Sequence, residues 1–202
     1  MKLVVGIGNP GKRYQGTRHN VGFDIMDLLA RQAGASKAKR RFEAQVVEAV
    51  LGGDRVAVMQ PQTYVNETGR AVRQASDWYR LSPEDLLVVC DDLNLSLGRL
   101  RLRPGGSSGG HRGLESVERS LGTQEFPRLR VGIGEPPRRD DGGEAVDYVL
   151  GRFTKQERAA IDAACQTAVD AIERWIRDGI EAAMNQFNRS DLDNNAKGGS
   201  DT

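Results

Sequence analysis

The chain lacks the residues and segments that define several classes of protein. Two cysteines in 202 residues are too few for a disulfide framework and indicate a reducing compartment. Two histidines, without the H-x-x-x-H spacing of many zinc sites, give little reason to expect a metal ion. No apolar run reaches the roughly 18 residues of a membrane span, and the N-terminus shows no signal-peptide pattern. We therefore predict a cytoplasmic protein with neither a metal ion nor a membrane attachment.

Aromatic residues and excess charge are also scarce. Aromatic side chains make up 5% of the chain, which argues against a sheet that binds nucleic acid by stacking bases. The 29 basic and 28 acidic residues nearly cancel, so bulk charge excludes a strongly basic nucleic-acid binder but leaves room for a local basic patch. The chain is long enough to bury a sizeable core. We expect one domain over residues 1–188 and a disordered, polar tail over residues 189–202.

Apolar or alternating segments and amphipathic helical patterns follow one another along the chain. Strands are predicted at residues 3–5, 42–51, 55–59, 86–90, 99–103 and 129–133. Helices are predicted at residues 21–33, 64–79, 113–121 and 154–187, the last with a break at Gly179. The turn Gly52-Gly53-Asp54 joins two strands into a hairpin, and residues 135–144 resemble a surface loop. This order predicts an α/β fold: a single-domain sandwich with a mostly parallel mixed β-sheet flanked by helices.

The loop from Gly6 to Asn20 follows the first predicted strand and contains the pattern G-x-G-x-x-G. In a dinucleotide site a helix begins at these glycines, so that its first N–H groups meet a pyrophosphate. Here Pro10 and residues 12–18 intervene, and the next helix begins only at Asn20, which we expect to be its N-cap. The pattern therefore does not predict dinucleotide binding.

Four polar residues follow predicted strands: Asn9, His19, Asn66 and Asp91. Sites in open α/β sheets collect at the carboxyl ends of strands. A histidine, a carboxylate and amides can support hydrolysis, because the histidine takes a proton from water, the carboxylate fixes its tautomer and the amides hold the oxyanion. Each residue also has an ordinary interpretation, as a surface histidine, a turn, a helix cap, or an aspartate that caps a loop or binds a divalent ion.

A local basic patch is the second functional feature. The segment from residue 99 to residue 112 contains no acid and four arginines: Arg99, Arg101, Arg103 and Arg112. Arg128 and Arg130 repeat the alternation on a later predicted strand. One such strand is typical of a solvated sheet face. Two of them beside the glycine-rich segment 105–110 favour a surface that binds the phosphate backbone of a nucleic acid.

Several ordered blocks of the sequence resemble the signature of the bacterial peptidyl-tRNA hydrolase family. They are Gly6–Gly11 with Tyr14 and Thr17–Asn20, Gln60–Asn66 with Gly69, Asp91–Leu93 with Leu97-Gly98, Gly105–Leu114, and Arg128–Gly134. The resemblance covers about residues 1–188, and blocks of this length are far more specific than one glycine pattern. It implies hydrolysis of the ester between a peptide and the 3′-terminal ribose of tRNA, by a monomer without metal or cofactor.

The resemblance also implies roles for individual residues. His19 would be the general base, Asp91 its orienting partner, and Asn9 and Asn66 the groups that bind the peptide carbonyl and backbone. Substrate or tRNA contacts would come from Tyr14, Tyr64, Asn66, Arg101, Arg103, Arg112 and Arg130. His111 matches the family motif, with a substrate contact and a structural role both open. The Gly105–Gly110 segment would act as a gate beside the site.

The sequence departs from the family pattern at three positions. Arg112 stands where many members have asparagine, Asn94 replaces a frequent aspartate, and Val65 replaces a frequent methionine. None of the three is among the residues implied in catalysis. Position 112, however, cannot supply the amide contact to water of those other members.

A second interpretation is a partner-binding relative of the family. Such relatives serve RNA splicing in organelles and can keep the catalytic residues. A protein of this kind would expose an extra apolar patch for its partner and would often carry a transit peptide. Neither feature is evident in the sequence.

Overall fold

The computed structural model describes residues 1–34, 37–136 and 144–188. In this part of the chain the strands form a seven-stranded sheet in the order β2-β3-β4-β1-β5-β7-β6. Their bounds are β1 (Lys2–Gly6), β2 (Lys39–Arg41), β3 (Ala44–Leu51), β4 (Asp54–Pro61), β5 (Leu86–Asp92), β6 (Leu100–Arg103) and β7 (Arg128–Gly132). β4, β1, β5 and β7 run parallel to one another. At one edge β3 pairs antiparallel with both β4 and β2, and at the other edge β6 pairs antiparallel with β7. The predicted mixed, mostly parallel sheet is confirmed.

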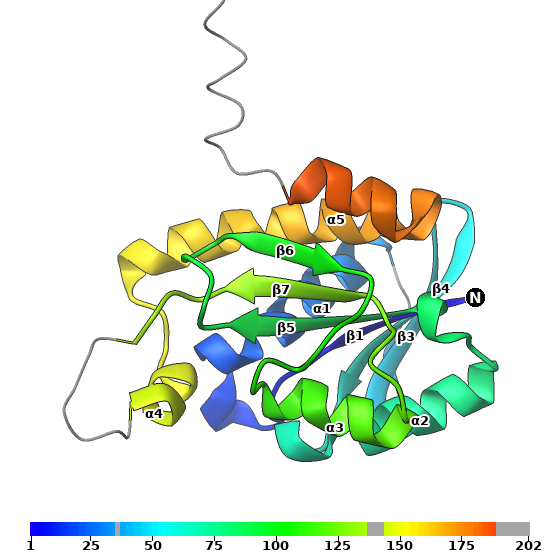
Figure 1. Cartoon of the computed structure of the whole chain (residues 1–202), viewed down its shortest axis with the longest axis horizontal. Helices are drawn as coiled ribbons and strands as arrows, with labels where there is room; N and C mark the ends of the chain where they lie inside the picture. Colours follow the sequence, from blue (N-terminus) through cyan, green and yellow to red (C-terminus); the bar gives the residue numbers. More distant parts are fainter. Residues whose placement is uncertain (35–36, 137–143, 189–202) are drawn as a thin grey trace, which may run out of the picture.

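Helices cover both faces of this sheet (Figure 1). Their bounds are α1 (Val21–Gln32), α2 (Thr68–Tyr79), α3 (Arg112–Leu121), α4 (Glu144–Leu150) and α5 (Lys155–Phe187). Side chains alternate along β1, so that Val4 joins the core under α1 and α5 while Leu3 and Val5 join the core under α2 and α3. Every residue of β5 is buried, as its continuous apolar run predicts for a strand covered on both faces.

The differences from the predicted elements lie at the periphery. The edge strand β2 is charged and lacks apolar alternation, so the sequence pattern does not identify it. The helix α4 begins at the end of the predicted surface loop. Residues 137–143 of that loop and the predicted tail 189–202 lie outside the described residues. Gly179, with a φ of 83°, interrupts α5 as predicted.

Two glycines bring α1 against β1 and so position the loop between them. A Cβ on Gly22 would lie 2.5 Å from the carbonyl oxygen of Ile7 and 2.8 Å from that of Val89, and a Cβ on Gly6 would lie 2.3 Å from the Gly22 carbonyl oxygen. Only glycine fits at both positions. This contact places the short 3-10 helix η2 (Arg18–Asn20), which directly precedes α1, near the carboxyl ends of β1 and β5.

Replacing Gly22 by alanine is expected to lower the free energy of unfolding by about 1–3 kcal/mol, because the added methyl group overpacks the contact between α1 and the sheet. Alanine favours the helical conformation over glycine by about 1 kcal/mol, and the loss from overpacking should exceed this gain. Urea denaturation measures the difference. The exposed Arg31 of the same helix supplies the control, since Arg31→Ala should change stability by no more than about 0.5 kcal/mol. A Gly22→Ala protein as stable as the parent would contradict the packing argument.

Candidate active site

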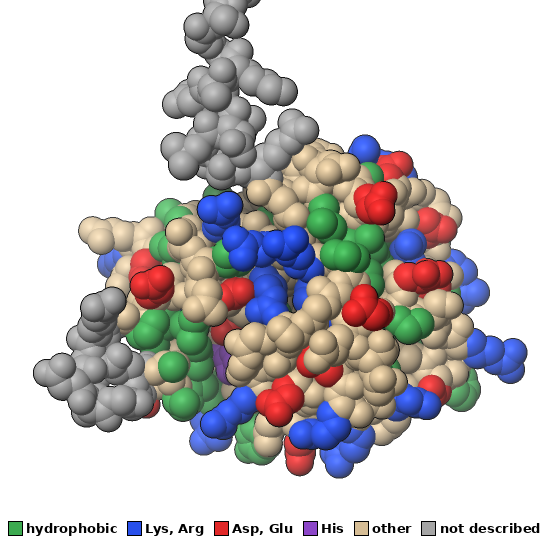
Figure 2. Space-filling view, viewed as in Figure 1, with side chains coloured by type: hydrophobic (Ala, Val, Ile, Leu, Met, Phe, Trp, Pro, Cys, Tyr) green, Lys and Arg blue, Asp and Glu red, His purple; other side chains and the backbone are tan. Residues whose placement is uncertain are grey.

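A cavity of about 500 Å³ opens at the carboxyl ends of β1 and β5. Its lining comes from the loop after β1, the 3-10 helix η3 (Val65–Glu67), the end of β5, the segment that leads into α3, and α4. The arrowheads of β5 and β7 point toward this end of the molecule, where α4 lies (Figure 1). In Figure 2, a patch of histidine surface lies in a hollow beside hydrophobic side chains, and a group of Lys and Arg side chains lies above it.

His19 and Asp91 meet in the wall of this cavity. His19 Nδ1 lies 2.7 Å from Asp91 Oδ1, and only 3% of the Asp91 side chain is exposed. His19 belongs to η2 and Asp91 to the end of β5, so the packing of α1 on the sheet joins residues that are 72 positions apart. Because the carboxylate accepts from Nδ1–H, Nε2 of His19 is left as the proton acceptor.

The environment of this pair favours a charged carboxylate and a basic imidazole. Burial lowers the pKa of His19, but the charge of Asp91 and its hydrogen bond raise that pKa by more, so it lies above the ordinary value. Burial alone would raise the pKa of Asp91, yet the facing His19 and His111 rings hold it well below its usual range. Asp91 therefore stays ionised at neutral pH, and His19 can accept a proton and keep it.

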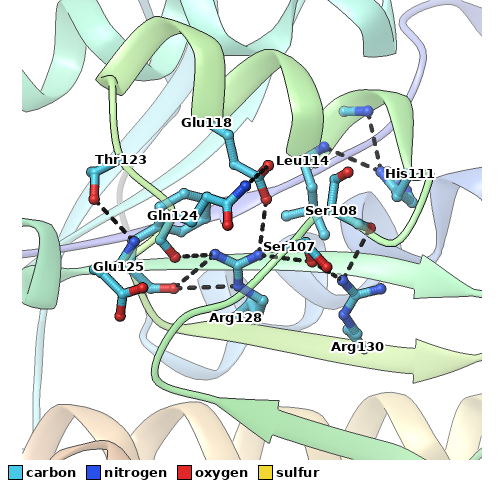
Figure 3. Close-up of polar contacts among 12 residues, drawn as sticks. Ser107, Ser108, His111, Leu114, Glu118, Thr123, Gln124, Glu125, Arg128 and Arg130 are labelled. Carbon is cyan, nitrogen blue, oxygen red and sulfur yellow. Dashed lines mark hydrogen bonds and ion pairs between the residues drawn. The ribbon is translucent and has the colours of Figure 1, made fainter.

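His111 contacts the same carboxylate oxygen. Its Nε2 lies 3.1 Å from Asp91 Oδ1. Its Nδ1 accepts from the backbone N–H groups of Gly113 and Leu114, at 3.1 and 3.2 Å, and so caps α3 (Figure 3). Because Nδ1 is an acceptor, Nε2 carries the proton and donates it to Asp91. Of the two roles left open for His111, this geometry supports the structural one.

Asn9 is fixed by hydrogen bonds on its backbone and on its side-chain oxygen. Its N–H donates to Asn20 Oδ1 and its carbonyl accepts from Asn20 Nδ2, both at 2.9 Å. Asn9 Oδ1 accepts from the N–H of Val65 at 3.2 Å, which leaves Nδ2 as the donor on the cavity side. Asn20 occupies the N-cap position of α1, as predicted, but its side-chain amide binds Asn9 and makes no cap hydrogen bond.

The other predicted contact residues are spread over the rim and beyond it. Tyr64, which is 53% exposed, and the exposed Asn66 line the cavity at η3, so Asn9, His19, Asn66 and Asp91 surround one space. Arg112 also lines the cavity, at the start of α3. Tyr14 is not among the lining residues; its ring lies 4.5 Å from the guanidinium of Arg13.

An apolar wall from α4 completes the cavity and was not predicted. Its residues are Ala145, Val146, Val149 and Leu150. Val146 and Leu150 are 55% and 38% exposed, although both are large apolar side chains. Their spacing of three and four residues is the helical signal that could have identified this wall from the sequence.

Arg18 attaches α4 and the start of α5 to the loop that carries His19. Arg18 Nη2 lies 3.0 and 2.9 Å from the two carboxylate oxygens of Glu157, and Nη1 donates to the carbonyl of Arg152 at 2.7 Å. The guanidinium also lies 4.2 Å from the ring centroid of Tyr148 in α4. An arginine whose planar guanidinium is held by several acceptors in this way fixes geometry as well as charge.

The two arginine strands differ from the predicted uniform basic face. On β6 the leucines are buried and Arg101 and Arg103 point outward, as predicted. On β7, Arg128 is only 1% exposed and pairs with Glu118 at 3.1 Å, so its expected place on a phosphate-binding surface is wrong. Arg128 is buried because its guanidinium also binds the carbonyls of Gln124 and Phe126 in the turn before the strand (Figure 3). Arg130 is largely buried, with 13% of its side chain exposed, and lines the cavity.

Among the described residues, His19, Asp91 and His111 form the one group that could hold a metal ion, with ligand atoms within 4.8 Å of one another. Both ring nitrogens that face Asp91 point at the same oxygen at hydrogen-bond distances. Two N–H donors that converge on a carboxylate oxygen suit a hydrogen-bonded cluster, whereas a metal ion needs lone pairs that converge on it. The donor geometry therefore fits proton transfer better than metal binding.

The chain was compared with known proteins, and a family model described as peptidyl-tRNA hydrolase matches residues 3–195. The chain belongs to the peptidyl-tRNA hydrolase family. It is 47% identical over 188 residues to the peptidyl-tRNA hydrolase of Rhodopirellula baltica, covering 93% of this chain and 97% of that relative. Identity to the Symbiobacterium thermophilum peptidyl-tRNA hydrolase is 49% over 189 residues, with 93% and 98% covered. The crystal structure of peptidyl-tRNA hydrolase from Acinetobacter baumannii matches with a TM-score of 0.86 at 34% identity, covering 93% and 94%.

Membership of the peptidyl-tRNA hydrolase family confirms the resemblance seen in the sequence blocks and the assignment to an enzyme class. The partner-binding alternative is not favoured, because the two relatives and the crystal structure described above are each named peptidyl-tRNA hydrolase and come from bacteria. Within residues 1–34, 37–136 and 144–188, no helix is both long enough and apolar enough to cross a membrane.

Proposed function

We propose that this chain hydrolyses the ester between a peptide and the 3′ ribose of tRNA, with His19 as the general base for water. The observation that carries this proposal is the 2.7 Å contact between His19 Nδ1 and the ionised Asp91. That contact selects the tautomer in which Nε2 is free to take a proton, and it stabilises the imidazolium that results. Residues 1–188 would form the catalytic domain, acting as a cytoplasmic monomer without metal or cofactor.

The reaction uses the cavity residues in a defined order. Water attacks the ester carbonyl carbon while His19 Nε2 takes its proton, and the carbonyl oxygen becomes an oxyanion. Asn9 Nδ2 and the amide of Asn66 are the donors available to bind the peptide carbonyl and backbone. When the bond between the carbonyl carbon and the ribose oxygen breaks, the imidazolium returns the proton to that oxygen. The products are a free peptide and a tRNA with its 3′ hydroxyl restored.

The cavity surroundings match the two parts of such a substrate. The apolar wall of α4 and the exposed Tyr64 offer contact to peptide side chains. The outward arginines of β6, with Arg112 and Arg130 at the cavity, offer contact to phosphates. Tyr14 does not line the cavity, and its contact with substrate or tRNA stays a prediction.

Removing positive charge from β6 should separate tRNA binding from chemistry. Each of Arg101→Met and Arg103→Met is expected to weaken peptidyl-tRNA binding and to reduce the slope of log affinity against log salt by about one, because one phosphate contact is lost. Hydrolysis of a small peptidyl ester should be spared, since neither side chain lines the cavity. Binding titrations at several salt concentrations and turnover on both substrates provide the test. Equal losses on the two substrates would count against a phosphate contact.

The reaction itself is tested by turnover of an N-acylated aminoacyl-tRNA with the unmodified chain in the presence and absence of a chelator. We expect release of intact tRNA and the N-acyl amino acid, at the same rate in both conditions. Failure to release either product, or a requirement for a metal ion, would contradict the proposal.

A further inference from the structure

Arg130, like the buried Arg128 beside it on β7, has a guanidinium that protein acceptors already engage. Its Nη2 donates to the carbonyl oxygens of Ser107 and Ser108, at 2.9 and 3.0 Å (Figure 3). Its Nη1 lies 3.2 Å from Asp92 Oδ2. Only 13% of the side chain is exposed. Arg101, its direct neighbour on β6, has no hydrogen bond of this kind among the described residues. The two arginines therefore share a position on the sheet but not an environment.

The carbonyls bound by Arg130 belong to the gate segment Gly105–Gly110, which leads directly to His111. The Ser108 carbonyl accepts from Arg130 and, at 3.2 Å, from the backbone N–H of His111, so one acceptor joins the arginine to the turn before α3. Gly109 has a φ of 62°, and a Cβ there would lie 3.4 Å from Arg130 Nη1, which shows how closely the segment follows the guanidinium.

This turn determines where His111 lies, and His111 determines how Asp91 is held. The His111 ring is fixed at both nitrogens, by the cap of α3 and by Asp91 Oδ1. A second connection passes through Asp92, which binds Arg130 with Oδ2 and accepts from the N–H of Asn94 with Oδ1 at 2.8 Å. Asp92 follows Asp91 in β5, so Arg130 contacts the supports of the catalytic carboxylate on two sides.

We propose that Arg130 is a positioning residue for hydrolysis, which holds the gate segment and through it the contact of His111 with Asp91. This inference rests on the proposed function, in which Asp91 orients His19. It goes beyond a phosphate contact, because it predicts that Arg130 matters for a substrate without phosphates. A tRNA phosphate that approaches Arg130 must share or replace its bonds to the gate carbonyls, so tRNA binding and gate position are coupled at this side chain.

The test compares Arg130→Met, Arg130→Lys and Arg101→Met on an N-acyl-aminoacyl ester that contains no phosphate. Arg130→Met is expected to lower kcat on this ester by roughly 10- to 100-fold with a smaller change in KM, since misplacing a catalytic group by about 1 Å can cost on the order of 100-fold. Arg130→Lys should fall between it and the parent, because an ammonium cannot serve all three acceptors in the planar geometry of the guanidinium. Arg55→Met, at an exposed position of β4, is the control for loss of an arginine.

A second measurement reads the geometry directly. The chain has only two histidines. The ¹⁵N signals of the labelled imidazole rings therefore come from His19 and His111 alone and report the tautomer of each ring. In Arg130→Met, the His111 signals should depart from the Nε2-protonated pattern, while they remain unchanged in Arg101→Met and Arg55→Met. The double variant Arg130→Met with His111→Asn should lose less activity than the product of the two single losses, because both act through one contact.

The outcomes separate this inference from the proposed function. If Arg130→Met and the control Arg55→Met have equal kcat values on the small ester and the His111 signals do not change, Arg130 is a phosphate contact only and the inference is wrong. If Arg130→Met does not fold, Arg130→Lys decides, and a kcat equal to that of the parent overturns the proposal. Full activity of a His19→Ala protein on the same ester would instead reject the general-base function.

Discussion

Replacing His19 by alanine is expected to lower kcat for peptidyl-tRNA hydrolysis by roughly 10²–10⁴-fold, the range typical of a lost general base. KM should change much less, because Asn9, Asn66 and the arginines on the tRNA side remain in place. The measurement is single-turnover and steady-state cleavage of a model peptidyl-tRNA. The size of the kcat loss relative to the KM change identifies the role of His19, since a base acts on the chemical step and a contact residue acts on binding.

The interpretation of His19→Ala depends on a folded protein. His19 is partly exposed and contributes its ring to the cavity wall, so the variant should keep the thermal unfolding transition of a folded domain. An equally fast His19→Ala protein would show that another group activates water. A loss confined to KM would show that His19 binds substrate and does not act as the base.

The second large effect is expected for Asp91→Asn, with a loss in kcat on the order of 10⁴, as when an amide replaces the carboxylate that orients a catalytic histidine. Two N–H donors, from His19 and His111, converge on Asp91 Oδ1. An amide can donate to His19 Nδ1 in place of accepting from it, which would leave the proton on Nε2 and remove the acceptor for water. The exposed Asp170→Asn in α5 is the control, with unchanged activity expected.

The pH profile distinguishes an orienting carboxylate from a merely structural one. In the parent, kcat/KM should fall as the pH drops through the raised pKa of His19, because the protonated ring cannot accept a proton from water. Without the charge of Asp91 the effect of burial remains, and burial lowers the pKa of His19. The residual activity of Asp91→Asn should therefore persist to lower pH than that of the parent. A profile that shifts to higher pH would contradict this assignment.

Much of the fold could be predicted because its signals are local. The apolar run Leu86–Cys90 and the alternation at Arg99–Arg103 each reflect the burial of one strand, and both strands are present with that burial. The edge strand β2 and the helix α4 were missed for a physical reason. β2 is a short, charged strand that is stabilised by pairing with β3. α4 is a short helix whose Tyr148 contacts Arg18 and the carbonyl of Ile133, and a local sequence pattern does not reveal such distant contacts.

The cavity residues Asn9, His19, Asn66 and Asp91 were predicted for a different reason. Parallel strands end at one edge of a sheet, so polar residues that follow β1, β4 and β5 converge whatever the loops between them contain. Arg128 shows the limit of such reasoning. Its alternation with Arg130 predicts a shared outward face, but the turn at Gln124–Phe126 and Glu118 supply acceptors that bury it.

The sequence by itself determined the α/β class and the family, because strand order and motif blocks are properties of the chain. It also identified Asn9, His19, Asn66 and Asp91 as polar residues that the fold brings to one cavity. The tertiary structure alone decided which nitrogen of each histidine carries a proton. It also decided that α4 supplies the apolar wall and that Arg130 binds the gate carbonyls. Those features depend on distances between atoms far apart in the chain, and such distances arise only when the helices and the sheet pack together.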